Sequence, residues 1–349
     1  MTLPSESIRT CANPRCPFCG RSGHVLHAGM RDVLYGVPGE WSHRRCEGCD
    51  LIWLDPLPLP EDLPKLYRNY HTHAGAGSDA GGDWWAWALP LFHVVRSGLF
   101  GYPFRGTWPQ KFLAWLLACV WPMRDLAGGT IAWTTLRRGG RWLDVGCGAG
   151  RFLKEMASLG WNVEGIEADP EACSSLGRNS SIRVHRGSLM DPLEGLGTFD
   201  VISVTHVIEH LDDPVAALKR CASWLNPGGR IVITTPNVRA LSRVQFGKHW
   251  RGWEVPRHLM LFSPQSLREC ASRSGLIPKA VWTISRGAPW FWLASLALSR
   301  GGDAESLGRT GGSPALRIAA LLFGLLEHFL APFGGRGEEI VLVAGKSDK

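Results

Sequence analysis

The sequence predicts an α/β protein built on a largely parallel sheet that is covered by helices on both faces. From residue 141 onward, short apolar strands alternate with helical segments, which is the pattern of parallel sheets. The first strand, 141–144, ends in Asp144 and runs into a turn with glycines at 146, 148 and 150, and a helix is expected over 152–159. Such a turn lets the backbone approach a ligand, while the helix offers free N–H groups. These observations predict a nucleotide-binding unit.

A second expected strand, 162–168, strengthens this prediction. It places Glu167 about 20 residues after the first glycine, the spacing of a carboxylate that binds a nucleotide ribose. A dinucleotide fingerprint needs its last glycine three residues after the second, but Arg151 stands there. A redox Rossmann site therefore fits this loop poorly.

The pattern Asp144-x-Gly-x-Gly-x-Gly150 resembles motif I of the Rossmann-like, class I S-adenosylmethionine-dependent methyltransferases. Glu167 is similar to the acid that ends their second strand, and the resemblance continues in order through 199–214, 225–237 and 256–264. It covers roughly residues 139–349. It is closest to the ubiquinone-type O-methyltransferases and the sugar-modifying methyltransferases.

This resemblance implies a seven-stranded, mostly parallel sheet with its last strand antiparallel, and S-adenosyl-L-methionine as cofactor. The positions that match the family's cofactor contacts are Asp144, Gly146, Gly148, Gly150, Glu167, Ser188, Leu189 and His206. Similar enzymes often present an acid to the adenine edge where Ser188 and Leu189 follow the third strand, 182–187. The serine hydroxyl can still hydrogen-bond adenine, and Asp191 is an alternative.

The resemblance also places candidate catalytic residues after the fourth strand, which we expect to end near Thr205, where cofactor and substrate meet in such folds. Methyl transfer to oxygen or to an acidic carbon needs a base, and histidine has an ordinary pKa suited to this work. We expect His210 to be the base, with Glu209 orienting it or binding substrate hydroxyls. His258 is expected to face the substrate, as are Arg251 and Arg257, which suit phosphate or carboxylate.

The same histidines have two other interpretations. Some relatives bind a divalent ion through Glu-x-x-Glu-His, and His206-x-x-Glu-His210 with His258 would make a similar set in which His206 replaces the first acid. Alternatively, the histidines only hydrogen-bond within their loop. The sequence leaves both interpretations open.

Four of the ten cysteines form two Cys-x-x-Cys pairs about 26 residues apart, Cys16 with Cys19 and Cys46 with Cys49. Tetrahedral zinc needs four ligands, and each pair delivers two thiolates from one tight turn, which the neighbouring Gly20 and Gly48 are expected to permit. The paired spacing argues against four unrelated thiols. Neither pair follows a strand and opens a helix, as a thioredoxin-like redox motif would. The sequence therefore predicts a zinc ribbon with a structural Zn²⁺.

These features divide the chain into a zinc ribbon over 1–60, a linker and apolar helical segment over 61–138, and a methyltransferase domain over 139–349. Residues 74–82 have linker composition. The apolar runs within 84–122 are too short to span a bilayer. An insertion, 287–335, holds two apolar helical segments, 288–298 and 315–330. We expect them to form a helical cap against 84–122, or else a surface that dips into a membrane interface.

The formal net charge of +7 suits anionic partners such as nucleotide-sugars, lipid-linked phosphates or an anionic membrane face. The first residues lack a secretory pattern, so we expect a cytoplasmic protein, with peripheral contact at the inner membrane face as a further expectation. Some of the 17 tryptophans are expected at an interface.

We expect a methyltransferase acting on oxygen or carbon of a small-molecule, nucleotide-sugar or lipid-linked acceptor. The turns that serve amino groups of bases or pyrimidine carbons are absent from the sequence. The alternative is an RNA methyltransferase that grips RNA through the ribbon, although few basic residues cluster there beyond Arg44 and Arg45. A third reading, a binding module with a relic cofactor site, conflicts with the intact glycines and Glu167.

Overall fold

The computed structural model describes residues 7–67, 89–103, 121–177, 182–193 and 195–346, with residues 107, 109, 112 and 116. The expected linker at 74–82 and most of the apolar stretch 104–120 lie outside the described residues. The chain forms two compact units. The first comprises 1–72, 206–219 and 233–342, and the second comprises 73–205, 220–232 and 343–349.

The expected seven-stranded sheet is present, mostly parallel and with its last strands antiparallel. Its strand order is β12-β13-β10-β9-β6-β7-β8. The strands are β6 (Arg141–Val145), β7 (Asn162–Glu167), β8 (Arg183–Arg186), β9 (Phe199–Thr205), β10 (Leu225–Pro236), β12 (Leu276–Ile284) and β13 (Glu339–Lys346). Parallel pairing joins β6 to both β7 and β9, and β7 to β8. The prediction of an α/β fold is confirmed.

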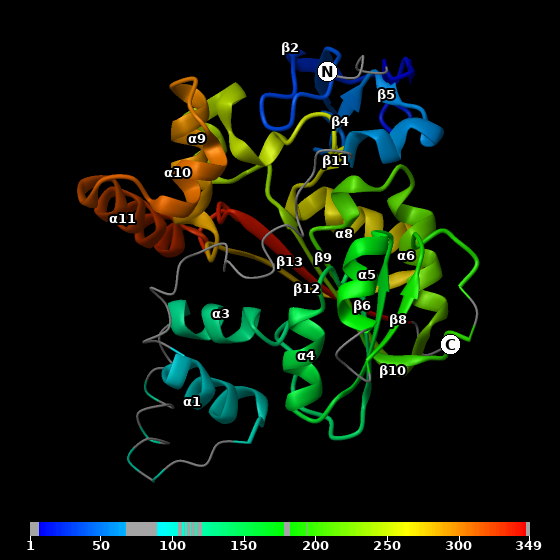
Figure 1. The fold of residues 1–349 in the computed structure, drawn as a ribbon, viewed down its shortest axis with the longest axis vertical. Helices are drawn as coiled ribbons and strands as arrows, with labels where there is room; N and C mark the ends of the chain where they lie inside the picture. Colours follow the sequence, from blue (N-terminus) through cyan, green and yellow to red (C-terminus); the bar gives the residue numbers. More distant parts are fainter. Residues whose placement is uncertain are drawn as a thin grey trace. The chain divides into compact units, whose positions relative to one another are not determined.

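In the second unit, α4 (Arg151–Ser158) packs on β7, and α5 (Pro170–Gly177) packs on β7 and β8 (Figure 1). The indole of Trp142, buried on β6, meets the Phe152 and Trp161 rings edge-on at 5.5 and 5.0 Å. A Cβ at Gly150 would lie 2.2 Å from Leu176 of α5, so this glycine is needed for packing as well as for the turn. Helices α1 (Leu89–Phe100) and α3 (Trp121–Gly129) pack against each other.

In the first unit, the cysteine-bearing segment shares a four-stranded sheet with a later part of the chain. Its order is β11-β4-β3-β2, with β2 (His24–Met30), β3 (Trp41–Arg45), β4 (Ile52–Asp55) and β11 (Met260–Leu261). A separate pair joins β1 (Thr10–Cys11) to β5 (Leu57–Pro58). Strand β11 pairs antiparallel with β4. Residues 1–60 therefore share both a sheet and a compact unit with 260–261.

Tryptophans fill the core of this first unit. Trp41, Trp250 and Trp253 are buried together with leucines and isoleucines of β4 and β11. The indoles of Trp250 and Trp253 meet edge-on at 5.3 Å. The other helical segments of this unit are η1 (Pro60–Tyr67), η3 (Ile208–His210), α7 (Leu241–Phe246), η4 (Gly247–His249), η5 (Arg251–Trp253) and α8 (Pro264–Arg273), while α6 (Pro214–Ser223) begins in the first unit and ends in the second.

The insertion holds three helices rather than the two that the sequence predicts. Both α9 (Ala288–Ser299) and α11 (Pro314–Leu330) match expected segments, while α10 (Ala304–Thr310) lies in the stretch between them. Helix α9 packs against both neighbours (Figure 1). Gly324 of α11 allows this approach, because a Cβ there would lie 2.8 Å from Pro289. None of the helices in the described residues has the length and hydrophobicity to cross a bilayer.

Candidate active site and metal centre

The loop between β6 and α4 has the backbone that a close-approaching ligand requires. Gly146, Gly148 and Gly150 have φ values of 70°, 52° and 71°, in the left-handed region that side chains disfavour. The N–H groups of Gly146 and Cys147 donate to the Ile166 carbonyl at 2.8 and 3.1 Å, which ties the loop to the end of β7. The backbone conformation therefore favours glycine at each of these three positions.

Glu167 stands at the end of β7 and is held by the loop that it faces. Its Oε2 accepts from the Gly148 N–H at 2.7 Å and its Oε1 accepts from the Asp169 N–H at 2.9 Å. A carboxylate has about four lone-pair sites, so both oxygens retain capacity for ribose hydroxyls. The glycine cradle and this oriented carboxylate fit the adenosine part of S-adenosyl-L-methionine.

Asp144 is buried at the end of β6. Burial raises its pKa to about 7, although the Ser203 hydroxyl, which donates to Asp144 Oδ1 at 2.6 Å, opposes the rise. Ser203 sits on β9 and was not predicted, since its contact arises only when β6 and β9 pair.

Ser188 and Leu189 follow β8. The Ser188 hydroxyl accepts from the Met190 N–H at 3.2 Å, and Asp191 Oδ2 accepts from the Ser188 N–H at 2.6 Å. Leu189 is buried. The Ser188 and Asp191 side chains therefore both hydrogen-bond within the turn that follows β8.

His206 directly follows β9 and has a left-handed φ of 52°. Its Nε2 lies 2.6 Å from Glu339 Oε1 and its Nδ1 lies 3.3 Å from Glu209 Oε1. Burial alone would lower the pKa of His206, but these two carboxylates raise it to about 10. Reciprocally, His206 holds the pKa of Glu209 at about 2 against its burial, while Thr235 donates to Glu209 Oε2 at 2.8 Å. His206 is therefore a fixed imidazolium rather than a base.

The hydrogen bonds of His210 and His258 assign their tautomers. Nδ1 of His210 lies 3.1 Å from the Arg257 carbonyl, and Nδ1 of His258 lies 2.8 Å from the Gly252 carbonyl. A carbonyl only accepts, so each Nδ1 carries the hydrogen and each Nε2 keeps a lone pair. Burial also lowers the pKa of His258 to about 4, which keeps it neutral at pH 7. Tyr67 adds a contact from its hydroxyl to His210 Nδ1 at 3.1 Å.

Glu209, His210 and His258 each offer a ligand atom, and these atoms lie within 4.8 Å of one another. Two imidazole nitrogens and a carboxylate suit zinc or iron. The metal site considered from the sequence also included His206. In the structure His206 is not part of the group, because its two ring nitrogens lie against the carboxylates of Glu209 and Glu339.

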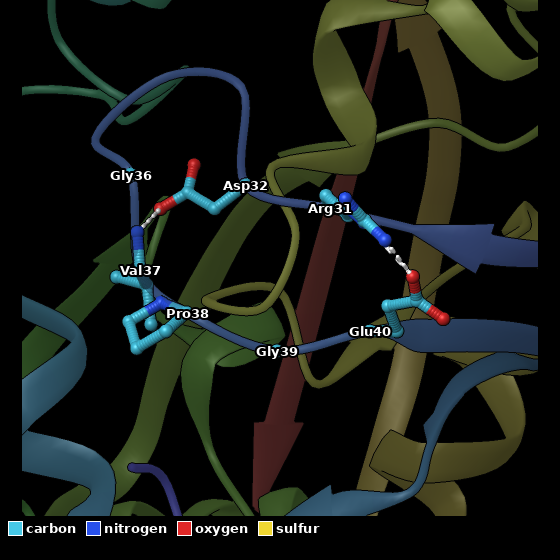
Figure 2. A pocket seen from close by; sticks show the side chains of 7 residues that line it. All are labelled: Arg31, Asp32, Gly36, Val37, Pro38, Gly39 and Glu40. Carbon is cyan, nitrogen blue, oxygen red and sulfur yellow. Dashed lines mark hydrogen bonds and ion pairs between the residues drawn. The ribbon is translucent and has the colours of Figure 1, made fainter. Parts of the chain in front are cut away.

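Arg251 and Arg257, expected to face the substrate, are buried in ion pairs. Arg257 donates to both Asp32 oxygens at 2.8 and 3.0 Å, and Arg251 donates to Glu254 Oε2 at 2.6 Å. Asp32 also accepts from backbone N–H groups of its own loop, including that of Val37. Figure 2 shows this loop around a hollow of about 370 Å³, closed on its other side by an Arg31–Glu40 pair. Asp32 thus orients Arg257, whose carbonyl orients His210.

The four cysteines of the two predicted knuckles come together. The sulfurs of Cys16 and Cys49 are 3.5 Å apart, those of Cys19 and Cys46 are 3.4 Å apart, and all four lie within 4.8 Å of one another. Sulfurs around a tetrahedral zinc lie roughly 3.8 Å apart, given Zn–S bonds of about 2.3 Å. The shared hydrogen bond lowers the pKa of Cys16 and raises that of Cys49. A divalent cation held by these four sulfurs would stabilise all four as thiolates.

The two knuckles have the same backbone hydrogen bonds. The N–H groups of Cys16 and Gly20 pair with Arg21 and Cys16 carbonyls, just as those of Cys46 and Asp50 pair with Leu51 and Cys46 carbonyls. Gly20 has the expected left-handed φ of 70°. In the second knuckle Asp50 takes this conformation, with φ of 61°, and Gly48 has no positive φ. Asp50 tolerates it because its carboxylate is held by Arg45 and Arg239.

Residues 125–278 match the family model described as a methyltransferase domain. A ubiquinone biosynthesis O-methyltransferase from Xanthomonas oryzae pv. oryzae is 38% identical over 105 residues, which are 28% of this chain and 44% of that protein. One from Xanthomonas axonopodis pv. citri is 37% identical over the same shares of the two chains. The chain thus spans less than half the length of these curated relatives.

Two solved structures with some similarity are named as methyltransferases. A TehB-like S-adenosylmethionine-dependent methyltransferase from Corynebacterium glutamicum has a TM-score of 0.39 and 21% identity, over 66% of this chain and 97% of that one. A sugar N-methyltransferase from Streptoalloteichus has a TM-score of 0.26 and 27% identity, over 27% of this chain and 40% of that one. Residues 125–278 thus form a methyltransferase domain, and the motif I loop and the seven-stranded sheet agree with the class I, Rossmann-like S-adenosylmethionine-dependent enzymes.

Proposed function

We propose that this protein transfers a methyl group from S-adenosyl-L-methionine to oxygen or carbon of a small-molecule, sugar or lipid-linked acceptor. The observation that carries the proposal is the loop of three left-handed glycines facing the Glu167 carboxylate. The cofactor, when bound, supplies a methyl group made electrophilic by a positively charged sulfur. The residues proposed to hold it are Asp144, Gly146, Gly148, Gly150, Glu167, Ser188, Leu189 and His206.

His210 is the base in this proposal. Its Nε2 lone pair accepts the proton as the acceptor's O–H or C–H bond breaks, and the electron pair left behind attacks the methyl group. The Arg257 carbonyl and the Tyr67 hydroxyl hold the ring from its Nδ1 side. Glu209, ionised because His206 lowers its pKa, stabilises the imidazolium that forms. His258 lies edge-on to His210, with ring centroids 4.8 Å apart, and faces the substrate in the proposal.

An acceptor with a phosphate or another anionic group is favoured by a basic cluster beside the second knuckle. Arg45 and Arg239 both bond Asp50, at 2.6 Å each. Burial and the charge of Arg45 lower the pKa of Arg243, whereas the Asp50 carboxylate acts to raise it. Three guanidinium groups around one carboxylate attract a further anion. A nucleotide-sugar or a lipid-linked phosphate carries such an anion.

The same basic cluster would also suit the phosphates of an RNA acceptor, which is the alternative function. RNA binding would weaken steeply with salt, because each neutralised phosphate releases counterions. Transfer to a small acceptor would depend on salt far less.

Zinc completes the proposal in a structural role. Four thiolates leave no open coordination position, so a bound Zn²⁺ would tie the two knuckles together without activating water. It would support the sheet that β4 shares with β11.

The first test is calorimetric titration of the zinc-loaded chain with S-adenosylhomocysteine. We expect micromolar binding that weakens about tenfold to a hundredfold in Glu167→Ala, since charge-assisted hydrogen bonds are worth about 1.5–3 kcal/mol. Glu171→Ala is the matched control, because Glu171 is exposed on the neighbouring helix α5 and should bind as wild type does. Absence of binding by folded wild-type protein would refute the proposal.

A further inference from the structure

Helix α11 exposes apolar side chains and buries polar ones, the reverse of an ordinary surface helix. Its exposed face carries six large apolar side chains that are 38–67% exposed: Ile318, Leu321, Leu322, Leu325, Leu326 and Phe329. Its buried face carries Ala320 and Gly324, but also the polar residues Glu327 and His328. A helix of a soluble protein normally turns its apolar stripe toward the core and its charges toward water. The medium that this face meets is therefore expected to be apolar.

The stripe runs the length of the helix and continues past its end. Its members recur at spacings of three and four residues, which keeps them on one face. Phe333, just beyond the helix, is 77% exposed. On the other side, α9 already covers α11, with Pro289 against Gly324 and the Trp292 and Phe323 rings 6.0 Å apart. The rigid packing against α9 holds the apolar face outward.

We propose that α11 is the surface through which this protein sits on an anionic lipid membrane, with the helix lying in the plane of the interface. Membrane binding would bring the active site to a lipid-linked acceptor, and only this link rests on the proposed function. At 17 residues the helix is too short to span a bilayer, and the described residues hold no spanning helix. An interfacial helix needs to bury only one apolar face.

Size and charge favour lipid over a second copy of the chain. A helix of 17 residues is about 25 Å long and about 10 Å wide, so the stripe covers about 250 Å², against about 800 Å² per partner in a stable dimer. The stripe is bordered by exposed arginines, Arg317 in its first turn and Arg336 beyond its end. Together with the net charge of +7, they complement an anionic headgroup layer.

Vesicle flotation of the full, zinc-loaded chain tests the proposal. Wild type is expected to float with phosphatidylcholine–phosphatidylglycerol vesicles and to float less with phosphatidylcholine alone. The double variant Leu322→Gln/Leu326→Gln should lower the fraction bound by about tenfold or more, because both side chains lose their apolar transfer energy. The matched control, Val33→Gln/Ile277→Gln, removes exposed apolar surface from other parts of the first unit and should float as wild type does.

Each other outcome overturns the proposal. If the α11 double variant floats as well as wild type, another surface binds lipid. If wild type does not float, light scattering then tells whether α11 mediates a dimer that the double variant breaks, and hydrogen exchange tells whether a monomer covers α11 with its own chain. Titration of the same variant with S-adenosylhomocysteine keeps the two proposals separate: intact binding leaves the cofactor site standing whatever the vesicles show.

Discussion

At the residue scale, the hydrogen bonds of His210 separate the roles of its two ring nitrogens. Nδ1 faces the Arg257 carbonyl and the Tyr67 hydroxyl, so only Nε2 is available as a base. We therefore predict that His210→Ala lowers kcat about 10²–10⁴-fold, the usual contribution of a general base, while S-adenosylhomocysteine binds as in wild type. Single-turnover rates together with calorimetric titration would check this. Normal turnover in His210→Ala would make another group the base.

Tyr67→Phe is the matched variant for this prediction. It removes one contact to Nδ1 and leaves the Arg257 carbonyl in place, so the rate should fall less than about tenfold. Treatment with a chelator distinguishes the remaining interpretation. If turnover is lost on chelation while the four-cysteine site keeps its zinc, and is restored by a divalent ion, then Glu209, His210 and His258 act as metal ligands.

What the sequence could predict at this scale depends on distance along the chain. The glycines and Glu167 were found because their spacing within one βαβ unit is fixed by the fold. Tyr67 lies 143 residues before His210, and Asp32 lies 225 residues before Arg257, so no local pattern could reveal either contact. Arg251 and Arg257 were read as substrate groups because an arginine's carboxylate partner is invisible in sequence.

At the scale of elements, the two knuckles are a repeated turn whose sulfurs converge without a disulfide. We predict one zinc ion per chain, released when Cys49→Ser removes one thiolate, with a lower melting temperature because ligand binding to the folded state stabilises it. Metal analysis by mass spectrometry and calorimetric melting check this prediction. Cys11→Ser, which changes an exposed cysteine outside both pairs, should keep zinc and melt as wild type does. Full zinc content in Cys49→Ser would contradict the four-thiolate site.

The elements of the parallel sheet were easier to predict than those of the insertion. Buried strands such as β6 and β9 read as short apolar runs bounded by turns, and their limits agree with the expected ones to within about two residues. In the insertion, the sequence does not predict helix α10 because its Gly-rich stretch has weak helix propensity. The helix forms there because it packs against α9. Strand β11 has only two residues and exists through its pairing with β4.

At the scale of the whole molecule, buried ionisable groups set how stability depends on pH. An acid or a base whose pKa is raised on folding stabilises the protein fully below its unfolded value, and this contribution is lost as the pH rises through the folded value. Asp144 with a pKa of about 7, Glu338 with about 8 and His206 with about 10 all belong to this class. The contribution of His206 is lost between about pH 6.5 and 10, whereas those of Asp144 and Glu338 are lost from about pH 4 up to about pH 7 and 8.

Groups whose pKa falls on folding act on the acid side. Burial lowers the pKa of His43 to about 3 and that of His258 to about 4, so both contribute stability above about pH 6.5 that is lost as the pH falls. Glu209, with its pKa held at about 2, contributes above about pH 4.5.

Glu338 gives the sharpest test of this balance, because its neighbours accept either protonation state. Burial raises its pKa to about 8, although Ser242 and Trp250 hydrogen-bond to its two oxygens. The pKa of Glu327 is raised as well, by burial and by the charge of Glu338. In Glu338→Gln, the amide oxygen can accept from Trp250 while the amide nitrogen donates to the Ser242 hydroxyl. The variant thus reproduces the neutral acid and cannot ionise.

We therefore predict that Glu338→Gln melts close to wild type at pH 4.5 and several degrees above it at pH 9, because the wild-type contribution is lost between the unfolded pKa of about 4.5 and the folded pKa of about 8. Melting curves at both pH values measure the difference. Glu269→Gln, on the exposed surface of α8, should show no such dependence, because its carboxylate is solvated in both states. A Glu338→Gln variant that melts below wild type by the same margin at both pH values would mean that hydrogen bonding, and not the charge, decides stability at this position.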